Sequence, residues 1–194
     1  MMKRLIYSLI LTTMLFNCTS GQQSKPTETK TMDDFELSPD KAHPNAKKIL
    51  TEDFYWSPIE ETGPFGSDDG SDCFYGFMEW RTENKNESPV TYLRELVQEW
   101  GYPSFDLNVT DSEKVKQLLS NMDSRMLIGQ DNAIVAIGFG QFVLEGKIDN
   151  DIKDLTKKAI KRELTTDLLN QFREDYRETR KGQLEKMLAV VDKM

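Results

Sequence analysis

The segment from Asn132 to Gly146 constrains the fold most strongly, because it carries no charged side chain from Ala133 to Leu144. As a strand it would be unusually long and apolar on both faces. As a helix, its apolar residues cover most of the circumference, which suits a buried central helix. Gly138 and Gly140 oppose this interpretation, each by about 1 kcal/mol relative to alanine. A glycine such as Gly146 is common just beyond the end of a helix. We therefore predict a central apolar helix that ends at this glycine.

Amphipathic patterns on both sides of this segment predict further helices. Ser67 is a good N-cap for one helix, and Ser88-Pro89 is a typical start of another. Residues 121–131 are expected to connect the preceding helix to the central one. A long helical pattern runs to the C-terminus, and its charged part from Arg173 to Lys181 is expected to face solvent. The sequence predicts an all-α fold, a single domain of about six helices around the central helix.

The N-terminus has the features of a bacterial lipoprotein signal peptide at residues 1–17. Lys3 and Arg4 are followed by an uncharged, mainly apolar segment from Leu5 to Phe16. That segment is shorter than the roughly 20 residues that span a bilayer. The sequence Leu15-Phe16-Asn17-Cys18 resembles a lipobox, although small residues usually stand where Phe16 and Asn17 do. We expect a lipid on Cys18; the alternative is an ordinary cleaved signal with an incidental cysteine.

The polar segment at residues 18–48 contains three prolines and predicts a flexible, disordered tether before the folded domain at residues 49–194. The chain's one histidine, His43, lies in this tether. The second cysteine, Cys73, is expected to be a small buried residue. Ser–His or Cys–His catalysis and His/Cys zinc sites are therefore unsupported, and no catalytic residue, cofactor or metal is predicted with confidence.

The charge balance is acidic and restricts the class of partner. Loss of Lys3 and Arg4 with the signal would lower the number of basic residues from 25 to 23 against 33 acidic ones, for a net charge of −10. Such a charge argues against nucleic acid and against adhesion to anionic lipid. It is compatible with a basic protein partner.

The candidate site is a group of carboxylates around the turn from Gly63 to Ser67. Asp68 and Asp69 would lie in the first turn of a helix, where the helix dipole favours negative charge. Oxygen-rich loops also bind calcium, but the spacing does not fit an EF-hand. Helix capping is the preferred interpretation, with a calcium site or carboxylate-based hydrolysis as the alternative. The candidate residues are Glu60, Glu61, Asp68, Asp69 and Asp72.

Two short motifs resemble a family of small bacterial proteins of unknown function. The family has a Gly-x-Phe-x-x-Asp-x-x-x-Asp motif that opens a helix, to which the segment from Gly63 to Asp72 is similar. It also has a central apolar helix ending in Gln-x-x-x-x-Gly-x-Leu-Asp, which the segment from Gln141 to Asp149 resembles. The tryptophan often found in the family's central helix is missing from Asn132 to Val135. The resemblance covers about residues 61–164 and implies a helical domain with no known activity.

Two functional hypotheses follow. The first is a lipid-anchored protein of the bacterial cell envelope that attaches to the membrane through Cys18 and binds another protein, with protection against a toxin or assembly of an envelope complex as examples. The second is a hydrolase or calcium-dependent site built around Asp68 and Asp72. The missing catalytic motifs favour the first hypothesis.

Overall fold

The structure is a computed structural model that describes residues 36–194, which belong to one compact unit. These residues form α-helices and one 3-10 turn and contain no strand, so the all-α prediction is confirmed. The predicted signal peptide and Cys18 lie outside the described residues. The helices are α1 (Pro44–Ile49), α2 (Asp68–Glu83), α3 (Pro89–Glu99), α4 (Ser112–Asn121), α5 (Ser124–Glu145), α6 (Asn150–Glu163), α7 (Thr166–Leu169) and α8 (Glu174–Val191), with the turn η2 at Asp53–Tyr55.

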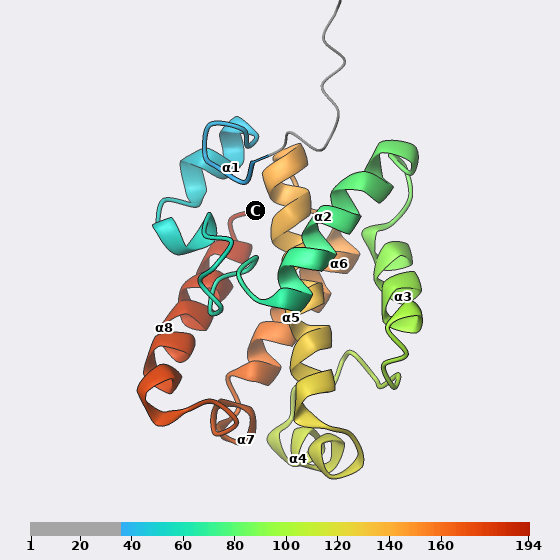
Figure 1. The fold of residues 1–194 in the computed structure, drawn as a ribbon, viewed down its shortest axis with the longest axis vertical. Helices are drawn as coiled ribbons and strands as arrows, with labels where there is room; N and C mark the ends of the chain where they lie inside the picture. Colours follow the sequence, from blue (N-terminus) through green and yellow to red (C-terminus); the bar gives the residue numbers. More distant parts are fainter. Residues whose placement is uncertain (1–35) are drawn as a thin grey trace, which may run out of the picture. The chain divides into compact units, whose positions relative to one another are not determined.

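Helix α5 is the central element of this unit, and the other helices surround it (Figure 1). It packs most extensively against α2 and α6, and also contacts α1 and α3. α5 is the one helix between residues 36 and 194 that is long and apolar enough to cross a membrane, and most of its apolar segment is buried inside the domain. Its composition is therefore accounted for by its place in the core.

Helix α5 begins at Ser124, so the predicted connection at residues 121–131 is wrong from Ser124 onwards, and only Met122 and Asp123 lie between α4 and α5. Asp123 caps the helix, its Oδ1 accepting a hydrogen bond from the backbone N–H of Arg125 at 2.8 Å. Gln130 and Asp131 are polar residues within this helix. Both are buried in the helix and hydrogen-bonded by neighbouring elements, which removes the usual cost of placing polar groups in a core.

Glycines in α5 allow neighbouring helices to approach closely. A Cβ added to Gly138 would lie 2.2 Å from Thr156 Oγ1 of α6, and one added to Gly140 would lie 2.8 Å from the ring of Phe74 in α2. Close packing thus offsets the low helix propensity of glycine. Cys73 is completely buried at the same α2–α5 contact, as predicted, and burial raises the pKa of its thiol well above the usual value.

The folded part begins before residue 49, within the segment predicted to be a flexible tether. Leu37 and Ala46 are buried in the core, and His43 caps α1. The ring of His43 lies against Gly146, which ends α5 with a φ of 69°. An added Cβ at Gly146 would lie 1.9 Å from His43 Nδ1. The composition of this stretch did not reveal the order because few of its residues contribute to the core.

Candidate functional site

The predicted carboxylates lie on a tightly folded loop at residues 57–67 and on the first turns of α2. The backbone N–H of Glu60 donates to Ser57 Oγ at 3.0 Å, and the N–H of Gly63 donates to the carbonyl of Glu60 at 2.7 Å. A Cβ added to Gly66 would lie 2.0 Å from that same carbonyl. Glycine therefore lets the loop fold back on itself, and this places Glu61 near the start of α2.

Ser67 caps α2 as predicted, with its Oγ accepting from the N–H of Gly70 at 3.1 Å. Asp68 is exposed in the first turn, whereas Asp69 is 9% exposed. Arg125 of α5 forms an ion pair with Asp69, and Tyr102 donates to the same carboxylate at 3.2 Å. Asp69 therefore joins α2 to α5 as well as lying in the first turn.

Arg180 of α8 holds the carboxylate loop from inside the domain. Its Nη1 donates to the carbonyl of Thr62 at 2.9 Å, and its Nη2 donates to Asn132 Oδ1 at 2.9 Å. Its guanidinium also pairs with Glu163 of α6 at 2.5 Å. The prediction that residues 173–181 all face solvent is wrong at Arg180, which is 2% exposed. The missed signal is its spacing from Leu184, which places both residues on one helix face.

A second buried ion pair lies beside the first. Arg162 of α6 and Asp131 of α5 are both fully buried, and their closest atoms are 2.5 Å apart. Burial raises the pKa of Asp131 to about 7, and the positive charge of Arg162 opposes that rise. The adjacent residues Asp131 and Asn132 thus each bind a buried arginine from another helix. In the sequence, the signal for these two arginines was the presence of Asp131 and Asn132 directly beside the apolar run.

The loop, α2, α5 and α8 line an open hollow of about 220 Å³, which shares Glu61, Phe172 and Tyr176 with a wider one of about 480 Å³. We call the two together the carboxylate groove. The first hollow is lined by Glu61, Ser67, Asp68, Asp69, Arg125, Ile128, Asn132, Phe172 and Tyr176, and the second adds Ile59, Gln171, Arg173 and Asp175. The structure thus brings together Glu61, Asp68 and Asp69 from the predicted set.

Glu61 and Asp68 are the two acidic lining residues that form no ion pair among residues 36–194. Asp69 is paired with Arg125, and Asp175 with Arg173, but neither Glu61 nor Asp68 forms an ion pair with any residue between 36 and 194. The pKa of the Tyr176 hydroxyl is raised, first by partial burial and then by the negative charges of Glu60 and Glu61. The groove therefore suits a positively charged group next to an aromatic surface.

The other two predicted residues, Glu60 and Asp72, do not line the groove. Glu60 accepts a hydrogen bond from Thr62 Oγ1 at 2.6 Å, and Asp72 is exposed one turn further along α2, outside the groove lining. Among residues 36–194, no three carboxylate, histidine or cysteine side chains lie close enough together to hold a metal ion. Asp69 lies in the first turn of α2, which Ser67 caps, and it forms an ion pair with Arg125.

Comparison with known proteins identifies a similar bacterial protein, which is itself uncharacterized. The chain is 28% identical over 131 residues to the uncharacterized protein YfeS of Escherichia coli (strain K12), which covers 66% of this chain and 53% of that protein. The chain thus spans about half the length of this relative. No family model and no solved structure matches the sequence. The similarity supports a relation to a bacterial protein of unknown function.

Proposed function

We propose that the protein is a lipid-anchored component of the bacterial cell envelope that binds a basic partner protein through the carboxylate groove. The observation that carries the proposal is the pair Glu61 and Asp68, two lining carboxylates that form no ion pair with residues 36–194, beside Phe172 and Tyr176. Arg125, which is paired with Asp69, is close enough to Asp68 to feel its charge, so Glu61 is the less compensated of the two. Lysine and arginine side chains of a partner would satisfy this charge.

The surface beside these carboxylates has the composition of a protein interface. Ile59 is 86% exposed at the rim of the groove, where a partner could cover its large apolar side chain. Phe172 and Tyr176 are each half-buried and expose part of an aromatic ring. Aromatic and apolar anchors surrounded by charged residues are typical of interfaces, where a few such side chains supply most of the binding energy.

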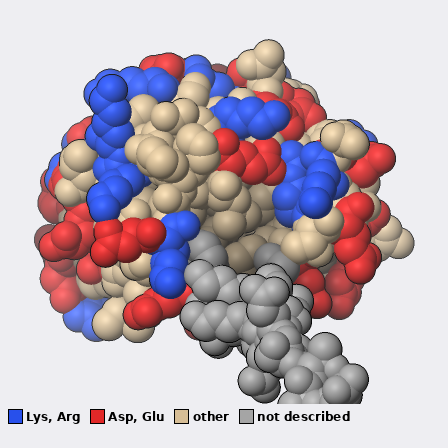
Figure 2. Space-filling view, turned by 90° about the horizontal axis from the view of Figure 1, so that it is seen from above, with Lys and Arg blue, Asp and Glu red and all other residues tan. Residues whose placement is uncertain are grey.

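The face drawn in Figure 2 shows no comparable concentration of acidic side chains. At the end of the domain seen in Figure 2, acidic and basic side chains alternate, with no broad area of one sign. A partner attracted only by net charge would have no preferred place there. The groove instead combines carboxylates that form no ion pair among residues 36–194 with apolar contacts, which favours one docking site.

The membrane anchor is supported by the N-terminal sequence alone. A basic start, a short apolar segment and Cys18 in a lipobox-like sequence suit attachment by acyl chains. Most of the apolar segment of α5 is buried inside the domain, so we do not assign the anchor to this helix. A lipid-attached domain would meet its partner in the envelope, on the membrane to which it is attached.

Site-specific photo-crosslinking in intact cells tests both parts of the proposal. A photoreactive amino acid replaces Ile59 in the full chain, or Glu95 on exposed α3 as the matched control. The Ile59 position is expected to give one adduct with a basic protein, recovered in the membrane fraction, and Glu95 should give none. An adduct found equally from both positions, or recovered only from the soluble fraction, would contradict the proposal.

A further inference from the structure

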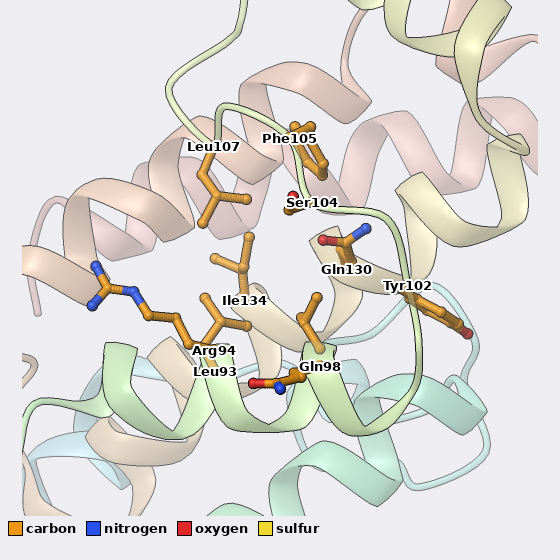
Figure 3. A pocket seen from close by; sticks show the side chains of 10 residues that line it. Leu93, Arg94, Gln98, Tyr102, Ser104, Phe105, Leu107, Gln130 and Ile134 are labelled. Atoms are coloured by element: carbon orange, nitrogen blue, oxygen red, sulfur yellow. The ribbon is translucent and has the colours of Figure 1, made fainter.

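A second pocket lies between α3, α5 and the loop at residues 102–107 (Figure 3). Its volume is about 490 Å³, within the range of sites that hold small molecules. Leu93 and Val97 of α3, Ile134 of α5 and Leu107 of the loop supply apolar walls. The pocket is thus large enough and apolar enough to hold the body of a small organic molecule.

The loop that forms one wall is fixed from inside the protein. The guanidinium carbon of Arg162 lies 4.9 Å from the centre of the Phe105 ring, and Arg162 Nη1 donates to the carbonyls of Leu107 at 3.1 Å and Val109 at 2.6 Å. Because Arg162 is itself held by Asp131, the loop is tied to the buried ion pair. The pocket is therefore preformed, which lowers the entropic cost of binding.

Gln130 presents a hydrogen-bond acceptor to the pocket. The residue is 2% exposed, and its Nε2 donates to the carbonyls of Pro103 at 3.1 Å and Met126 at 3.4 Å. These two acceptors determine which end of the amide is nitrogen, so the oxygen faces the cavity, as Figure 3 shows. Among the described residues, no group donates to this oxygen.

Polar side chains at the pocket's rim also lack partners. Arg94 forms no ion pair or hydrogen bond with residues 36–194, and the same holds for the side chains of Gln98 and Ser104. Arg94 lies at one end of the pocket and Gln130 at the other, with Leu93 and Ile134 between them (Figure 3). The single charged lining residue is a cation, although the chain as a whole is acidic.

We propose that this pocket binds a small amphipathic organic acid, with its anionic group at Arg94, its apolar body between α3 and Ile134, and a hydroxyl or N–H donor at Gln130. Guanidinium groups bind carboxylates and sulfonates with charge-assisted hydrogen bonds. The pocket and the carboxylate groove share no lining residue, and the hydrogen bond from Tyr102 to Asp69 joins their walls.

The test uses 8-anilinonaphthalene-1-sulfonate, which combines aromatic rings, an anionic sulfonate and one N–H. Fluorescence titration of the full chain is expected to show saturable binding at one site. Arg94→Ala should weaken binding about tenfold, the usual size of one charge-assisted hydrogen bond, and Ser104→Trp should abolish it by filling the cavity. The matched controls Lys116→Ala and Ser120→Trp, on exposed positions of α4, should bind like wild type.

Displacement then tests the acid itself. Decanoate should displace the dye at concentrations about tenfold lower than decanol does, and Arg94→Ala should remove this difference. Circular dichroism shows whether each variant remains folded. Non-saturable binding, equal binding by folded Ser104→Trp, or equal displacement by acid and alcohol would overturn the proposal.

Discussion

Replacing Arg180 with methionine is expected to lower the free energy of unfolding by about 3–5 kcal/mol, because it leaves a buried carboxylate without its cation. Glu163 is completely buried, and its Oε2 accepts from Arg180 Nε at 3.1 Å and Nη2 at 2.5 Å. Its Oε1 has no hydrogen-bond partner among the described residues. Arg180 is thus the main group that stabilises this charge. Urea denaturation followed by circular dichroism measures the loss.

A double variant separates the loss of the pair from the loss of packing. Arg180→Met combined with Glu163→Met removes both charges, and it is expected to recover most of the stability lost in the single variant. The control Arg173→Met breaks the exposed pair with Asp175 and should change the unfolding free energy by less than about 0.5 kcal/mol. A double variant as unstable as the sum of its two single variants would contradict the account of Glu163.

Replacing Phe139 with alanine is also expected to cost about 3–5 kcal/mol, through the cavity it leaves in the core. Phe139 is fully buried in α5, and its ring stacks on that of Tyr55 with centroids 5.7 Å apart. Phe139→Leu retains part of the side-chain volume and should cost less, which makes the pair of variants a graded test. The urea midpoints of the two variants measure the effect. A loss below about 1 kcal/mol for alanine would show that Phe139 is not at the centre of the core.

The apolar run was enough to predict the C-terminal part of α5 and its end at Gly146, since both depend on local pattern. The start of the helix was not predictable from that pattern, because Asp131 is acceptable in a core only when Arg162 lies beside it. Asp131 and Arg162 are brought into contact by the packing of α5 against α6. The two residues are 31 positions apart, so a pattern read over neighbouring residues does not predict their ion pair.

The candidate site shows the same division between local and distant information. Ser67, Asp68 and Asp69 were predicted together because helix capping is a local property. Thr62 and Arg180 are 118 positions apart, and only the packing of α8 brings them into contact. That packing also brings Tyr176 to the carboxylates and thus completes the groove.

The most direct measurement of the central claim is the affinity of the purified full chain for the protein captured by the Ile59 crosslink. Glu61→Gln combined with Asp68→Asn neutralises the groove, and Glu83→Gln combined with Glu95→Gln makes the same charge change at exposed sites elsewhere. The groove variant is expected to bind about tenfold more weakly, the control should bind like wild type, and salt should weaken wild-type binding by screening. Equal affinity for all three proteins would contradict the claim that the carboxylate groove binds a basic partner.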